Sequence, residues 1–141
     1  MPNDVEFRVS PQQAMIYAMM LVAGADREMK NVELGQVGRL VQQLPAFGRI
    51  DPESLPEIAR ECAVMVHAED GVEATLRVIA GALPPGLRET CYLCACEIAA
   101  IDSRAPIEEL RVLQRLRNAL GLDRLVSAAL ERATAARLAA A

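Results

Sequence analysis

The sequence predicts an all-α protein, a single compact bundle of about seven helices. Apolar residues recur at helical spacing, separated by capping residues, along the whole chain. No segment shows the sustained apolar–polar alternation, rich in β-branched or aromatic residues, that is typical of a strand. Connections are short and no Gly/Ser/Pro-rich linker divides the chain, so residues 1–141 are expected to form one domain.

The first two predicted helices have clear start and stop signals. Ser10 is a capping residue followed by proline at the first helical position, and this helix is expected to reach about Ala25. A second helix is predicted over about Val32 to Gln43, because Pro45 follows it. The residues expected to face the core in this second helix are Leu34, Val37, Leu40, Val41 and Leu44.

The third and fourth helices also begin at predicted caps. The third is expected to open at Asp51, which precedes a proline, and to run to about His67. Asp70 with Glu73 three residues later predicts a capping box at the start of the fourth, which ends before Pro84. The inward-facing residues predicted for the third helix are Ile58, Cys62 and Met65.

Three further helices complete the predicted bundle. The segment from Leu87 to Ala100 is apolar and rich in small residues, so we expect a helix buried on more than one face. The next helix follows Pro106 and ends at Gly121, which can adopt the positive φ of a helix cap. The last begins at Asp123 and is expected to fade into the alanine-rich tail, which we do not expect to carry function.

Composition argues against several classes of function. The chain has 15 basic and 19 acidic residues, a formal net charge of -4, so it lacks the cationic excess that binds nucleic acid. The longest apolar run, Ala14 to Ala25, is shorter than the roughly 18 residues of a membrane span, so no transmembrane segment is predicted. No signal-peptide pattern opens the chain, and a cytoplasmic location is expected.

An internal repeat is the most informative pattern. Aligning the chain with itself at an offset of 76 residues places residues 86–120 on residues 10–44. Asp102 then falls on Asp26 and Glu109 on Glu33, which gives Asp-x6-Glu twice between the paired helices. We therefore predict a pseudo-two-fold repeat of helical hairpins.

The repeated carboxylates allow two interpretations. In the simpler one, Asp26 and Asp102 form turns and Glu33 and Glu109 favour helix N-termini. In the other, both hairpins turn their carboxylates into a shared cleft and bind a cation; Glu108, beside Glu109, joins this candidate set. Oxygen-only ligands suit Ca²⁺ or Mg²⁺, although the spacing is not that of an EF-hand.

The two turn segments resemble the tellurite-resistance TerB family. The resemblance rests on Ala23-Gly24-Ala25-Asp26 to Glu33-Leu34 and on Ala99-Ala100-Ile101-Asp102 to Glu108-Glu109-Leu110, and it extends from about Ser10 to Arg132. It implies an all-α fold of about seven helices with internal two-fold symmetry, a non-enzymatic role, and an acidic surface suspected of binding metal. It also implies tellurite or chemical-stress resistance and complexes with partner proteins at the inner face of the membrane.

This sequence departs from the family pattern at the turns. The family commonly has Asp-Gly, whereas Arg27 and Ser103 follow the aspartates here, so the easy left-handed turn is lost. Lys30 and Pro106 stand where a Ser or Thr cap is usual, and Lys30 is placed to neutralise Asp26 and Glu33. We therefore expect the second pair, Asp102 with Glu108 or Glu109, to be the better cation site.

Other candidate groups favour structural roles. Cys91 and Cys94 share a helical face while Cys96 points elsewhere, so we expect buried thiols and not a metal site; a tellurite-reactive thiol is the alternative. The single histidine, His67, is expected to interact with a helix C-terminus. No nucleophile–base pair or phosphate loop is evident, so no enzyme is predicted. The remaining alternative is an interaction scaffold or homodimer that uses apolar residues of the last helix, namely Leu125, Val126 and Leu130.

Overall fold

The computed structural model describes residues 9–24, 31–48, 50–100 and 107–141, apart from the side chains of residues 31–33. Within these ranges the chain forms seven α-helices, two short 3-10 helices and no strand, which confirms the all-α prediction. The helices are α1 (Pro11–Ala23), α2 (Asn31–Gln43), α3 (Leu55–His67), α4 (Gly71–Ala82), α5 (Pro85–Ala100), α6 (Ile107–Leu120) and α7 (Arg124–Leu138). The 3-10 helices are η1 (Pro45–Phe47) and η2 (Pro52–Ser54).

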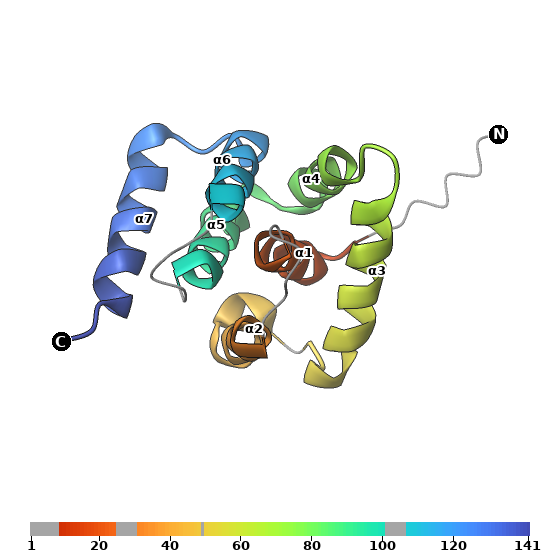
Figure 1. The fold of residues 1–141 in the computed structure, drawn as a ribbon, viewed down its shortest axis with the longest axis horizontal. Helices are drawn as coiled ribbons and strands as arrows, with labels where there is room; N and C mark the ends of the chain where they lie inside the picture. Colours follow the sequence, from red (N-terminus) through yellow and green to blue (C-terminus); the bar gives the residue numbers. More distant parts are fainter. Residues whose placement is uncertain (1–8, 25–30, 49, 101–106) are drawn as a thin grey trace.

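Helix α1 is the centre of the bundle (Figure 1). It packs against α2, α3, α4, α5 and α6, and every residue from Ala14 to Ala23 is buried. A helix that is apolar on all sides is stable in water only when other helices surround it. The predicted capping box fixes its start: the Ser10 hydroxyl accepts a hydrogen bond from the Gln13 amide at 3.1 Å, and the Gln13 side chain accepts one from the Ser10 amide at 2.9 Å.

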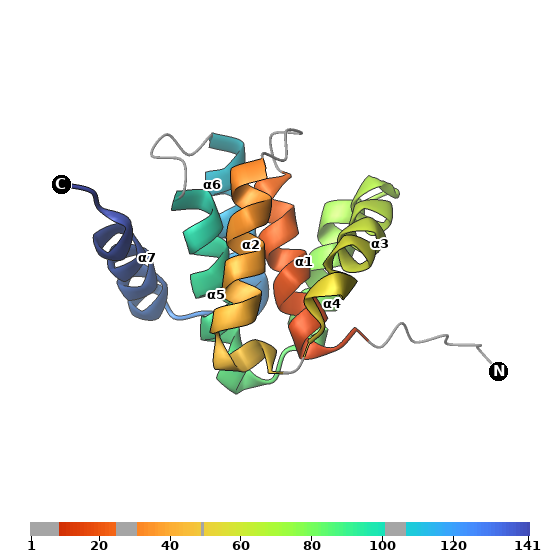
Figure 2. The same ribbon diagram turned by 90° about the horizontal axis from the view of Figure 1, so that it is seen from below.

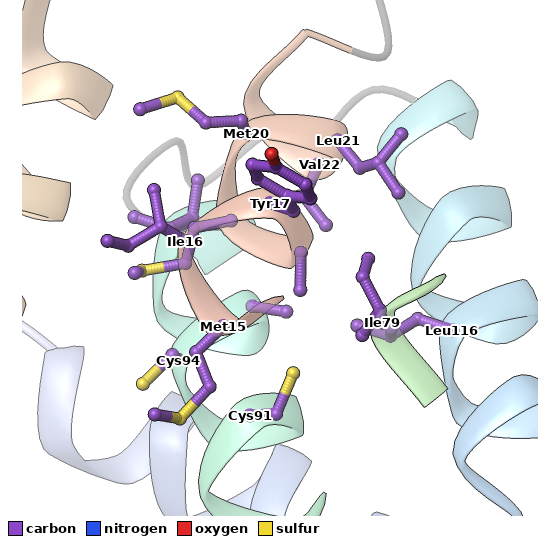
Figure 3. Close-up of a cluster of buried hydrophobic side chains, with 14 of the residues drawn as sticks. Met15, Ile16, Tyr17, Met20, Leu21, Val22, Ile79, Cys91, Cys94 and Leu116 are labelled. Carbon is purple, nitrogen blue, oxygen red and sulfur yellow. The ribbon is translucent and has the colours of Figure 1, made fainter. Parts of the chain in front are cut away.

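Side chains from α1 and its neighbours form the core (Figure 3). Met15 lies beside Cys91 and Cys94, which reach toward it from α5. Ile79 of α4 and Leu116 of α6 close the other side of the same cluster. The core therefore joins the first predicted hairpin, α1 with α2, to the second, α5 with α6. The two-fold axis between these hairpins stays a prediction.

One prediction about helix packing was wrong: Leu34 of α2 was expected in the core but is 39% exposed. Leu110 of α6, at the matching position of the repeat, is 52% exposed. Val37 is buried, as predicted, and so is its repeat match Leu113. An amphipathic helix buries only one stripe, and the first turns of both helices present these leucines outside it.

The starts of α3 and α4 also differ from expectation. Asp51 accepts a hydrogen bond from the Glu53 amide at 3.0 Å, but it opens η2, and α3 begins only at Leu55. The capping box predicted for Asp70 and Glu73 is wrong. Asp70 has a left-handed backbone (φ 51°) and its side chain makes no capping bond, while the Glu73 carboxylate pairs with Arg115 of α6. The tight reversal from α3 into α4 sets this backbone, so the side-chain geometry of an N-cap is lost.

Helix α6 ends and α7 begins as their sequences predict. Gly121 has φ +64°, and the amide of Leu122 donates to the Arg117 carbonyl at 3.2 Å, which closes α6 with a Schellman motif. Asp123 accepts a hydrogen bond from the Leu125 amide at 3.0 Å and begins α7. The tail is more ordered than predicted, because α7 continues to Leu138.

Helix α7 lies on the outside of the bundle and packs mainly on α5 (Figures 1 and 2). Arg88 of α5 binds the other helices near their ends: its guanidinium donates to the Leu120 carbonyl of α6 at 2.9 Å and to the Ala80 carbonyl of α4 at 3.2 Å. An arginine at helix C-termini satisfies carbonyls that have no helical partner and opposes the helix dipole. None of the described helices is both long and apolar enough to cross a membrane.

Candidate functional site

The helix ends that flank the two repeated turns lie at one end of the bundle. Figure 2 shows the end of α1, the start of α2, the end of α5 and the start of α6 at the same level. Glu33 lies in the first turn of α2. Asp26, Asp102 and the side chain of Glu33 lie outside the described residues, so their predicted convergence is not tested here. We call this region the turn end of the bundle.

Glu108 and Glu109 point in different directions from the first turn of α6. The Glu109 side chain is 1% exposed and lies inside the bundle, whereas Glu108 is exposed. Consecutive helix residues are rotated by about 100°, so neighbouring carboxylates cannot share one face. Glu109 is also the residue that the repeat matches to Glu33. Of the two candidates, Glu109 is therefore the inward one.

A cation site cannot be built from the described residues alone. They contain no group of three or more His, Cys, Asp or Glu side chains arranged to hold a metal ion. Helix α6 supplies Glu109, and any larger set of carboxylates requires Asp26, Asp102 or Glu33. The interpretation of these carboxylates as turn and cap residues therefore stays open beside the cation hypothesis.

A cleft of about 790 Å³ lies between α1, α3, α4 and α6. Its apolar lining includes Met20 and Leu21 at the end of α1 and Cys62 and Val66 on α3. Four polar residues also line it: His67, Glu108, Arg111 and Arg115. Glu108 was predicted as part of the cation set, whereas Arg111 and Arg115 were not predicted as site residues. The sequence of one helix does not show which other helices its side chains face.

A smaller cleft of about 500 Å³ is lined by residues of α5, α6 and α7. Tyr92 lies at its base and donates a hydrogen bond from its hydroxyl to the Glu131 carboxylate of α7 at 2.8 Å. Burial, together with this hydrogen bond, raises the pKa of the Tyr92 phenol. This phenol therefore stays protonated and holds α7 against α5.

An ion pair between a buried glutamate and an exposed arginine also joins α5 and α7. Glu97 of α5 is 5% exposed, and its Oε1 atom accepts a hydrogen bond from Nε of Arg137 at 2.5 Å. Its other oxygen, Oε2, is buried and has no hydrogen-bond partner among the described residues. The carboxylate also raises the pKa of the Arg137 guanidinium through this contact. Neither residue was predicted from the sequence, although a glutamate within the otherwise apolar run from Cys94 to Ala99 was a signal.

The four cysteines are buried, as predicted, and none of them forms a disulfide bond. Cys91 and Cys94 face α1, while Cys96 lines the smaller cleft. Burial raises the pKa of Cys62, Cys94 and Cys96 from 9.0 to about 12, and that of Cys91 as well. The thiolate is the reactive form of cysteine. These thiols are thus poor candidates for reaction with tellurite or binding of metal.

The raised thiol pKa values predict alkaline instability. A thiol that ionises near pH 9 in the unfolded chain and near pH 12 in the folded chain holds its proton longer when folded. Its contribution to stability is complete below pH 9 and is lost as the pH rises toward 12, by about 1.4 kcal/mol per pH unit for each thiol. We expect an unchanged melting temperature from pH 7 to about 8.5 and a steep fall above pH 9.

A reactivity measurement checks the same account at constant pH. The folded protein at pH 8 should react with the thiol reagent DTNB far more slowly than the protein in guanidinium chloride. The Cys94→Ala variant should lose stability less steeply with pH than the wild type. Rapid reaction of all four thiols in the folded protein would show that they are accessible as thiolates.

His67 is the last residue of α3, so it lies at the helix C-terminus where the sequence predicts it. Its side chain is exposed and also lines the larger cleft. Its position therefore fits a helix-end residue that any ligand in this cleft would meet.

The chain matches a known protein family over most of its length. The family described as tellurite resistance protein TerB matches residues 8–132. The match includes both predicted hairpins and all of the residues in the candidate cation set. No curated protein and no solved structure matches the chain significantly.

Proposed function

Because this chain belongs to the tellurite-resistance TerB family, we propose that it is a non-enzymatic helical module that binds a divalent cation and docks partner proteins. The proposed ligands are Asp26, Glu33, Asp102 and Glu109. Glu108 is an outer candidate, because it is exposed on the side of the larger cleft. The ion would be Ca²⁺ or Mg²⁺, which prefer oxygen ligands.

One observation carries this proposal: the four helix ends that flank the two Asp-x6-Glu segments meet at the turn end of the bundle (Figure 2). Helices α1, α2 and α6 each pack on α5, and α1 also packs on α2 and α6, so the described ends of the two predicted hairpins belong to helices in contact. The inward placement of Glu109 adds a carboxylate that faces the bundle and not the solvent. A cation bound between the hairpins would join them and stabilise the folded chain.

Thermal unfolding with Ca²⁺, Mg²⁺, Mn²⁺ and Zn²⁺ tests the proposal. A ligand at 100 times its Kd adds about 2.7 kcal/mol to the folded state, which raises the melting temperature by roughly 8 °C for a chain of this size. We expect this rise with Ca²⁺ or Mg²⁺ in the wild type and its loss in Asp102→Ala. The control Glu69→Ala removes an exposed carboxylate between α3 and α4 and should respond as the wild type does.

A second candidate function is an interaction scaffold whose carboxylates are only structural. Large apolar side chains exposed on α3, α6 and α7 support this alternative, since Val64, Ile107, Leu110 and Leu125 are all more than half exposed. The homodimer face suggested by the last helix is narrower than predicted, because Val126 and Leu130 are half-buried and Leu125 is exposed. No thermal shift with any cation would favour this function.

The family assignment also suggests the setting in which either function would operate. We propose resistance to tellurite or related chemical stress, in the cytoplasm, through complexes with proteins at the inner face of the membrane. The buried thiols argue against direct reduction of tellurite by this chain. Binding is therefore the mode of action that we favour.

A further inference from the structure

We propose that the larger cleft, between α1, α3, α4 and α6, binds a small amphiphile that has an apolar chain and an anionic head group. The residues that carry this proposal are Arg111, Arg115 and the apolar lining, none of which is a proposed cation ligand. Glu108, the outer candidate of the cation set, also lines this cleft. The cleft volume of about 790 Å³ falls within the roughly 300–1,000 Å³ of ligand pockets.

The inner lining of the cleft is apolar and suits a hydrocarbon chain. Most of its lining residues are apolar, and they come from all four helices: Met20, Leu21, Cys62, Val66, Val72 and Val112. Met20, Leu21 and Cys62 are almost fully buried, so they form the deepest part. Ala59 and Ala63, one turn apart on α3, leave room because their side chains are short.

The polar residues of the cleft favour a negative head group. Arg111 and Arg115 lie one turn apart on α6, and His67 lies at the end of α3. Arg115 already pairs with Glu73 of α4, whereas Arg111 makes no ion pair with another described side chain. Of the charged residues that line the cleft, two are arginines and one is a glutamate, although the chain as a whole has a net charge of -4. A free guanidinium binds a carboxylate or phosphate with two hydrogen bonds.

Glu108 provides an internal test of this charge argument. It lines the same cleft one turn before Arg111, where it would repel an anionic head group. If a cation were the ligand of this cleft, removal of the Glu108 charge would weaken binding. If the ligand is an anion, the same change should strengthen it.

Isothermal titration with three ten-carbon probes tests the proposal: decanoate, decanol and decylamine. We expect decanoate to bind about tenfold more tightly than decanol, and decylamine to bind least. Arg111→Gln should weaken decanoate binding about tenfold and bring it to the level of decanol. Glu108→Gln should tighten it by about two- to threefold.

Matched variants separate this cleft from general effects. Arg117→Gln changes an arginine of the same helix that lines the smaller cleft, and it should bind decanoate as the wild type does. Ala63→Trp fills the larger cleft from an exposed position of α3 and should abolish binding while the circular dichroism spectrum stays helical. Equal affinity for decanoate and decanol, wild-type binding by Arg111→Gln, or no binding of decanoate at about 1 mM would each overturn the proposal.

Discussion

The Gly71→Ala variant is expected to lose about 3 kcal/mol or more of folding stability, with a fall of roughly 10 °C in melting temperature. Gly71 is the first residue of α4 and is buried against the end of α3. A methyl group built on it would overlap the carbonyl group of Val66 and crowd that of Met65. These are backbone atoms of α3 that no side-chain rotation can move aside, so the two helices must separate.

A second glycine of the same helix provides the control. Gly81 is exposed, and a methyl group added to it has no atom within 4 Å. Because alanine is the better helix former, Gly81→Ala should stabilise the protein by about 0.5–1 kcal/mol. Urea unfolding of both variants measures the difference. Equal stability of the two would mean that α3 and α4 do not approach as closely as described.

The Arg137→Ala variant is expected to lose about 2–3 kcal/mol, because it leaves the buried Glu97 carboxylate without its partner. This loss is at the low end of the range measured when one partner of a buried ion pair is removed. The Arg137 side chain is 57% exposed, so water can replace part of its interaction with Glu97. The effect should be seen as earlier unfolding in urea and as faster hydrogen exchange along α7.

Two further variants test whether the loss of stability comes from the buried Glu97 charge that Arg137→Ala leaves without a partner. Arg132→Ala removes an exposed arginine of α7 and should change stability by less than about 0.5 kcal/mol. Glu97→Gln combined with Arg137→Ala should be more stable than Arg137→Ala alone, because no buried charge remains. If Arg137→Ala is as stable as Arg132→Ala, the contact with Arg137 does not stabilise the buried Glu97 carboxylate.

The fold could be predicted from sequence because its signals are local. Ser10 with Gln13, Gly121 and Asp123 each act within one helical turn, and all have the predicted capping role. The apolar periodicity of the helices also sets which faces are buried. The predictions were wrong where contacts between helices determine the local structure. Asp70 has a left-handed backbone, and Glu73 pairs with Arg115 instead of capping α4.

The candidate sites were less predictable, because they depend on the directions in which helices face one another. A sequence identifies Glu108 and Glu109 as acidic, but only packing shows that one is buried and the other lines a cleft. The contact made by Arg137 was not predicted, because this residue lies in the alanine-rich tail, where the last helix was expected to end. Its partner Glu97 is 40 residues away, a separation over which single-sequence periodicity carries no information.

We propose that carboxylates at the turn end of the bundle bind one divalent cation. Equilibrium dialysis against Ca²⁺ and Mg²⁺, followed by elemental analysis, measures this binding. We expect about one ion per chain in the wild type and in Glu69→Ala, and none in the Asp26→Ala/Asp102→Ala variant. An absence of bound ion in the wild type, or unchanged binding in the double variant, would contradict it and leave the carboxylates as turn and cap residues.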